Sequence, residues 1–77
     1  MEPLIKLLLD RFDNIRKHEV TKTLKFLGPG HEERLNRLTD AIQSKLLHHP
    51  IEYLRQCDPE TEEGQRAMQF VRELFEL

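Results

Sequence analysis

Apolar side chains three and four residues apart recur along almost the whole chain, and no segment alternates apolar and polar residues with a period of two. The first spacing gathers side chains on one face of an α-helix, whereas a half-buried strand requires the second. A chain with only the first pattern is restricted to helical architectures. The sequence therefore predicts an all-α fold, a small helical bundle.

The first helix is expected to run from about Pro3 to residue 27. Gly28-Pro29-Gly30 stops it, and Gly28 is placed for a left-handed cap. Two apolar stripes follow one another along this helix: Ile5, Leu8, Phe12 and Ile15, and then Val20, Leu24 and Leu27. The step of five between the stripes rotates the buried face. We therefore expect the two halves of this helix to pack against different neighbours.

Two prolines suggest how the rest of the chain divides. Pro50 is expected to end the second helix, because the residue before a proline avoids the helical region, and to begin a short third helix. Asp58-Pro59 is expected to open the terminal helix, as a capping aspartate followed by proline at the first helical position. Thr61 is a second possible cap for this helix.

The chain has few apolar residues with which to form a core. It has 77 residues, of which 38% are hydrophobic and none is Trp. A domain this small buries only about 60% of the surface that its unfolded chain exposes. One cysteine, Cys57, allows no internal disulfide, so a partner subunit is the remaining common remedy. We expect two-fold dimerization to complete the bundle.

Seven apolar residues of the second and terminal helices are the candidates for this shared core, within and between subunits. The spacing does not divide them between the two roles. They are Leu35, Leu38, Ile42, Leu46, Val71, Leu74 and Phe75.

No catalytic, metal-binding or cofactor-binding motif is found. Cys57 is close to Asp58 and Glu60, whose charges disfavour a reactive thiolate. His48 and His49 are adjacent, so they point apart on a helix and do not form a metal site. No glycine-rich phosphate loop is present.

Charge and hydropathy narrow the range of partners. The formal net charge is −2 and acidic residues are interleaved with basic ones, which argues against strong nonspecific binding to nucleic acid. The longest apolar cluster, residues 4–9, is far too short to span a membrane. A single cysteine agrees with a reducing compartment. We expect a cytoplasmic protein without membrane contact.

Three segments, in the same order, resemble the C-terminal dimerization domain of glutamyl-tRNA reductase. The central segment from Leu38 to Ile51 reads LTDAIQSKLLHHPI, and residues 71–77 read VRELFEL. Upstream, residues 15–20 read IRKHEV and residues 24–28 read LKFLG. The resemblance covers the chain from about Pro3 to Leu77. It departs from the family at Gln43-Ser44, where Val-Asn is usual, and at Val20, where Leu is usual.

The resemblance implies a function that the residues alone do not. Glutamyl-tRNA reductase uses NADPH to make glutamate-1-semialdehyde from glutamyl-tRNA, for the synthesis of 5-aminolevulinate, haem and chlorophyll. Residues 1–27 would then end a long connecting, or spinal, helix, and residues 31–77 would form the helical dimerization domain. The chain itself would hold no cofactor and would pair with a second copy of itself, meeting glutamyl-tRNA only through the parent enzyme.

Two further expectations accompany this interpretation. Lys45 and His48 are expected to have a structural role near the end of the second helix, where a cation suits the carbonyl groups. The alternative function is a free-standing helical protein that binds tRNA or acts as an adaptor.

Overall fold

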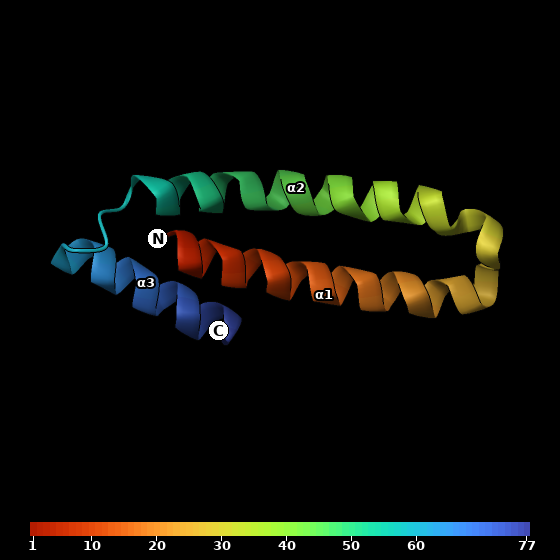
Figure 1. Ribbon diagram of the computed structural model, residues 1–77, viewed down its shortest axis with the longest axis horizontal. Coiled ribbons are helices and arrows are strands. Elements are labelled where there is room, and N and C mark those ends of the chain that lie inside the picture. The colour runs from red at the N-terminus through yellow and green to blue at the C-terminus, as the bar shows by residue number, and fades with distance from the viewer.

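The structure, a computed structural model that describes residues 1–77, is a long helical hairpin with a third helix folded back along one end (Figure 1). Helix α1 spans Glu2–Leu27, a single 3₁₀ turn, η1, spans Pro29–His31, and α2 spans Glu32–Gln56. Helix α3 spans Glu62–Phe75 and lies beside the N-terminal end of α1. The predicted all-α class is confirmed, and the molecule measures 50 × 19 × 15 Å.

The bend between α1 and α2 forms where the sequence predicts it. Gly28 has a φ of 88°, which a residue with a side chain rarely adopts, and its N–H donates to the carbonyl of Leu24 at 2.8 Å. Its ψ of 168° lies outside the left-handed helical region, so the predicted left-handed cap is wrong although glycine is still required. Pro29 then starts the 3₁₀ turn. The chain reverses here, so α1 and α2 run antiparallel.

The predicted break at Pro50 is wrong. Helix α2 is continuous from Glu32 to Gln56 with Pro50 inside it, and no separate short helix follows. A proline removes one intrahelical hydrogen bond and costs about 3 kcal/mol in a helix interior. Here Leu47 and Leu54, on either side of Pro50, are both buried in the core, and Pro50 itself faces solvent. Packing on both sides of the proline therefore stabilises one continuous helix.

The start of α3 lies slightly later than Asp58-Pro59. Thr61 is the cap, and its Oγ1 accepts a hydrogen bond from the N–H of Gly64 at 3.0 Å. The carboxylate of Asp58 accepts instead from the N–H of Glu60 at 2.9 Å and closes the preceding turn. The predicted cap at Asp58 is therefore wrong and the helix begins three residues after Pro59, at Glu62, whereas the second predicted cap, Thr61, is the one that the helix uses.

The core lies at the end of the hairpin where α3 folds back. Five residues form its buried centre: Leu4, Ile5, Leu8, Leu47 and Leu54. Phe75 of α3 packs its ring edge-on against Phe12 of α1, with the ring centroids 5.5 Å apart. Only seven of the 77 residues are buried. The thin core expected from the composition is thus observed.

Both halves of α1 pack beside α2, and only the N-terminal half also meets α3, so the predicted difference in neighbours is found in part. Leu4, Ile5 and Leu8 share the core, against which side chains of both α2 and α3 pack. Val20 is also buried, but it lies about two turns beyond Phe12, the α1 residue that the last turn of α3 contacts. No helix contains a stretch long and apolar enough to cross a membrane.

The first turn of α3 offers a test of this fold. Gly64 is buried, and a Cβ added there would collide with the carbonyl group of Asp58. We expect Gly64→Ala to lower the free energy of unfolding by about 2 kcal/mol, as steric clashes in packed sites do. Urea unfolding followed by far-ultraviolet circular dichroism measures this difference.

Gly30→Ala is the matched control. A Cβ at Gly30 meets nothing within 4 Å, so the free energy of unfolding should change by no more than about 0.5 kcal/mol. Equal effects of the two substitutions would contradict the close approach of α3 to the Asp58 turn.

Candidate functional site

One side of α2 carries a row of apolar side chains that no other part of the chain covers. Leu38, Ile42 and Leu46, each four residues from the next, are 58%, 50% and 66% exposed. Leu35 precedes them in the same row and is half-buried. We call these four residues the α2 stripe. A contiguous exposed row of large apolar residues is typical of an interaction surface.

The α2 stripe lies apart from the side of α2 that enters the core. At 100° per residue, its centre is roughly a quarter turn or more around the helix from Leu47 and Leu54. Both leucines are almost completely buried, at 3% and 1% exposed. Helix α2 therefore has two apolar sides, of which the chain uses one.

The structure separates the predicted residues of α3. Val71 and Phe75 pack against the core of the same chain, whereas Leu74 is 59% exposed. Phe70 is also exposed, and with Tyr53 of α2 it lines a shallow groove between the two helices. Tyr53 and Phe70 were not among the seven residues predicted for the core shared within and between subunits. Phe70 could have been included, because it extends the apolar arc of α3.

An apolar groove lies between α1 and α2 beyond the end of α3. Phe12, Ile15 and Glu19 line it from α1, and Ile42 and Leu46 line it from α2. Ile15, predicted to be buried with Phe12, is instead 54% exposed. The reason is the length of α3, whose last turn covers Phe12 and reaches no further along α1. We call this feature the open groove.

A polar cluster joins the two long helices at the floor of the open groove. The guanidinium of Arg16 donates to Asn36 Oδ1 at 3.0 Å and to Thr39 Oγ1 at 3.3 Å, both on α2. It also pairs with Asp13 Oδ1 at 2.9 Å within α1. The Arg16 side chain is only 13% exposed. This cluster, from here on the Arg16 clamp, was not predicted from the sequence.

The carboxylate of the clamp is held in its charged form. Hydrogen bonds from Lys17 and from Arg16 lower the pKa of Asp13 below its usual value of 3.8, against a smaller opposing effect of burial. The Lys17 ammonium lies 2.9 Å from Asp13 Oδ2. The positive charge of Arg16 is therefore paired with a carboxylate at every pH at which Asp13 is ionised.

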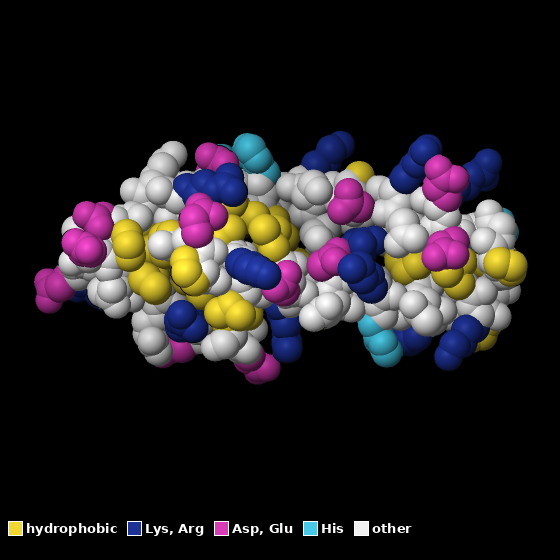
Figure 2. Space-filling view, viewed as in Figure 1, with side chains coloured by type: hydrophobic (Ala, Val, Ile, Leu, Met, Phe, Trp, Pro, Cys, Tyr) yellow, Lys and Arg dark blue, Asp and Glu magenta, His cyan; other side chains and the backbone are white.

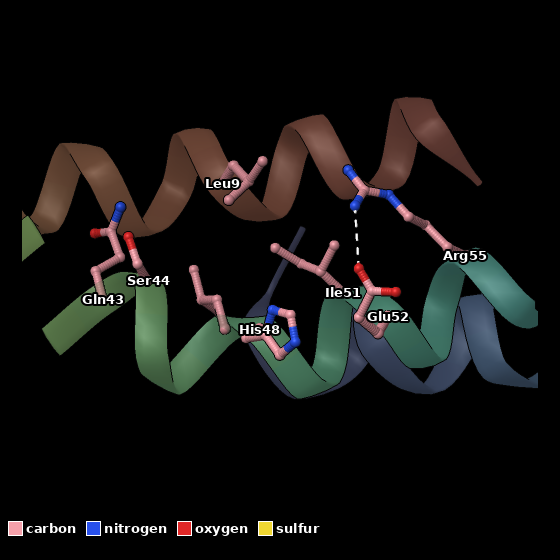
Figure 3. A pocket seen from close by; sticks show the side chains of 8 residues that line it. Leu9, Gln43, Ser44, His48, Ile51, Glu52 and Arg55 are labelled. Carbon is pink, nitrogen blue, oxygen red and sulfur yellow. Dashed lines mark hydrogen bonds and ion pairs between the residues drawn. The ribbon is translucent and has the colours of Figure 1, made fainter. Parts of the chain in front are cut away.

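A pocket on the opposite side of the hairpin has no catalytic arrangement (Figure 3). Leu9, Ile51 and His48 line it, together with an ion pair in which Arg55 Nη1 and Glu52 Oε1 are 3.3 Å apart. The expected role of His48 and Lys45 at a helix end is wrong, because α2 continues past both to Gln56. No group of three potential metal ligands lies together anywhere in the chain.

Comparison with known proteins identifies the family of this chain. The profile of the family described as "Glutamyl-tRNAGlu reductase, dimerisation domain" matches residues 1–77. The chain belongs to this family. Membership in a dimerisation-domain family implies self-association.

Individual relatives agree with the family. The glutamyl-tRNA reductase of Citrifermentans bemidjiense is 43% identical over 97% of this chain, and that of Cyanothece sp. is 41% identical over 97%. The glutamyl-tRNA reductase of Nitratidesulfovibrio vulgaris is 36% identical over 100% of the chain. In each case the match covers 18% of the relative, so the chain spans about a fifth of these proteins. No solved structure matches the chain.

The exposed apolar residues of this dimerisation domain form two groups, and charged side chains lie between the groups. Figure 2 shows hydrophobic side chains gathered over the end that carries α3 and again toward the bend, with charged side chains between them. The residues that the sequence singled out and that remain exposed are Leu38, Ile42, Leu46 and Leu74. Their place in a dimer interface stays a prediction.

The lowered pKa of Asp13 gives a dependence of stability on pH. A carboxyl group with a lower pKa in the folded state stabilises the fold above its unfolded pKa of about 3.9. This contribution is lost as the pH falls through the folded value. We expect Asp13→Asn to lower the free energy of unfolding at pH 7, and this difference from the parent to disappear toward pH 2.

Urea unfolding at a series of pH values measures this difference. Asp10→Asn is the control, because Asp10 is exposed and lies 3.8 Å from its Lys6 partner. An exposed pair of that kind contributes little. The same pH profile for both substitutions would show that the clamp does not stabilise ionised Asp13.

Proposed function

We propose that this chain is the homodimerization module of a glutamyl-tRNA reductase and that two copies pair through the α2 stripe and the open groove. The observation that carries the proposal is the exposure of Leu38, Ile42 and Leu46 on one side of a helix whose other apolar side is already buried. Leu35 and Leu74 would border the contact. Val71 and Phe75 would support it from inside the chain.

Symmetry determines how such a stripe pairs. In a two-fold dimer the same surface of both copies is used, and residue i of one contacts residue j of the other in both directions. An antiparallel pair of α2 helices centred on Ile42 would bring Leu38 of one copy near Leu46 of the other. Ile42 would then meet its own equivalent near the axis.

The apolar surface available is substantial for so small a chain. Fully burying an exposed Leu or Ile is worth about 1.5–3 kcal/mol, so a half-exposed residue still gains roughly 1 kcal/mol. Three stripe residues from each copy give about 6 kcal/mol, to which Ile15 and Leu74 add. Association itself costs several kcal/mol, so the whole face is needed for a stable pair.

The parent enzyme's activity is part of the same proposal. The relatives are named glutamyl-tRNA reductases, and we propose that this domain serves such an enzyme, which uses NADPH and belongs to tetrapyrrole synthesis in the cytoplasm. Residues 1–27 would be the end of a longer connecting helix, and residues 31–77 the dimerization domain. No step of that chemistry is placed on the residues of this chain.

Sedimentation equilibrium tests the dimer directly. The chain has a mass of 9.2 kDa, and we expect a species of twice that mass at micromolar concentration. A single 9.2 kDa species at all concentrations up to the millimolar range would overturn the proposal.

Ile42→Asp tests the face. Because Ile42 is half-exposed in the single chain, the substitution should leave the helices folded, and it would place two like charges near the axis of the dimer. We expect the dimer dissociation constant to rise at least about 100-fold, equivalent to roughly 2.7 kcal/mol.

Ser44→Asp is the matched control for Ile42→Asp. It adds the same charge to an exposed position on the other side of α2, next to the pocket of Figure 3, and should leave the dissociation constant within about twofold of the parent, or roughly 0.4 kcal/mol. A dimer that tolerates Ile42→Asp as well as Ser44→Asp would place the interface elsewhere.

The alternative of a free-standing tRNA-binding protein is less well supported. Several basic residues of α1 are paired with acidic neighbours, such as Lys17 with Asp13 at 2.9 Å and Lys22 with Glu19 at 3.4 Å. Titration with tRNA at two salt concentrations separates the functions, because phosphate contacts make the affinity fall steeply with salt.

A further inference from the structure

The half of α2 nearest the bend contributes no buried residue to the packing of the hairpin. None of the residues from Glu32 to Leu46 is buried, and the buried residues of α2 are Leu47 and Leu54, toward its other end. Between Leu8 and Val20, α1 contributes no buried residue either. Beyond the core, Val20 of α1 is the one apolar residue buried beside α2, so side-chain packing constrains the rotation of α2 less there than in the core.

In this half, α2 turns polar residues toward α1 and apolar residues away from it. Asn36 and Thr39 face α1 and are bonded by Arg16, whereas Leu38 and Ile42 are exposed. Burial of apolar surface alone would favour the opposite rotation, in which Ile42 and Leu46 close on Ile15 across the open groove. Some other interaction must oppose that closure.

We propose that Arg16 is a positioning residue that holds this half of α2 with its polar side toward α1 and so keeps the α2 stripe free for a second copy. The inference rests on the proposed self-association through that stripe. An arginine remains charged in a protein, and here its Nη1 group donates to both acceptors on α2 while Nε and Nη2 bond Asp13 on α1. Rotating α2 toward closure would remove both acceptors from a guanidinium that is almost hidden from water.

The remaining hydrogen bonds of the clamp support this assignment. Thr39 Oγ1 also donates to the carbonyl of Leu35 at 2.7 Å, which fixes its orientation on α2. Asp13 anchors the guanidinium from α1 at 2.9 Å and supplies the balancing charge. No other side-chain hydrogen bond joins α1 to the bend-proximal half of α2, so the clamp is the polar side-chain contact that fixes its orientation there.

Arg16→Met tests the proposal, because it replaces the clamp by an apolar side chain that favours closure. The stripe must be free in both copies, so closure in two thirds of the chains would raise the apparent dimer dissociation constant roughly tenfold. Arg37→Met is the matched control. Arg37 is an exposed arginine of α2 whose guanidinium pairs only with Glu33, at 2.7 Å, and its loss should leave the dissociation constant unchanged.

Thiol labelling distinguishes closure from loss of structure. In a Cys57→Ser background, Ile42→Cys and Gln43→Cys each introduce one thiol, on the exposed stripe and on the half-buried side facing α1 respectively. With N-ethylmaleimide at concentrations where the chain is monomeric, Arg16→Met should slow labelling of the first thiol about threefold on the same population shift and should accelerate labelling of the second. A merely destabilising substitution would accelerate both.

Two further variants complete the test. Arg16→Lys retains the charge and should restore part of the original pattern, since an ammonium reaches Asp13 but cannot form the fork. Asn36→Ala removes one acceptor of the clamp and should change the labelling rates in the same direction as Arg16→Met, but more weakly. It also provides the test if Arg16→Met does not fold.

The labelling experiment can fail independently of the proposed dimerization. A parent chain that is monomeric at every concentration overturns the dimer, and reciprocal labelling would still establish that Arg16 sets the rotation of α2. Labelling that is unchanged, or that rises at both thiols, overturns the role of Arg16 even where the parent chain dimerizes.

Discussion

The contact of Leu4, Ile5 and Leu8 with Leu47 and Leu54 is the interaction on which the rest of the structure depends. Five such side chains, at about 2 kcal/mol each, contribute roughly 10 kcal/mol, which is the size of a small domain's whole stability. The other parts of the structure pack against this contact or extend from it. Helix α3 packs against it through Val71 and Phe75, and the bend-proximal half of the hairpin extends from it without a core of its own.

The position of the core explains why a proline is accepted inside α2. Pro50 lies between two leucines that both enter the core, so ending the helix there would displace one of them. The cost of the proline, about 3 kcal/mol, is offset by the burial of Leu54 together with Ile51, which also follows Pro50 and packs against the core. The helix-breaking tendency of proline is a local preference, and here the tertiary contacts on either side are stronger.

The same arrangement leaves apolar surface exposed that a second copy of the chain could cover. Because α3 ends over Phe12, Ile15 and the α2 stripe remain open, and this is the surface that membership in a dimerisation-domain family leads us to assign to a second copy. A polar interaction between the long helices complements it. Arg16 occupies the position where an apolar side chain would draw the stripe inward, so charge and hydrogen bonding direct the apolar surface outward.

Much of the architecture was predictable from the sequence because it depends on neighbours along the chain. Residue spacing determined the helical class, Gly28 determined the bend through its positive φ, and Asp58-Pro59 indicated the last boundary. The motif from Leu38 to Ile51 indicated the family, which the profile match over residues 1–77 confirms.

Only the tertiary structure decided which apolar residues are covered. Periodicity shows that Leu47 and Leu54 share one side of α2 and that Leu38, Ile42 and Leu46 share another, but it does not show which of the two sides is covered. Which side meets α1, where α3 ends, and that Arg16 reaches residues 20 and 23 positions away all depend on contacts between distant segments. Such contacts arise from the packing of whole helices, and no local pattern of residues encodes them.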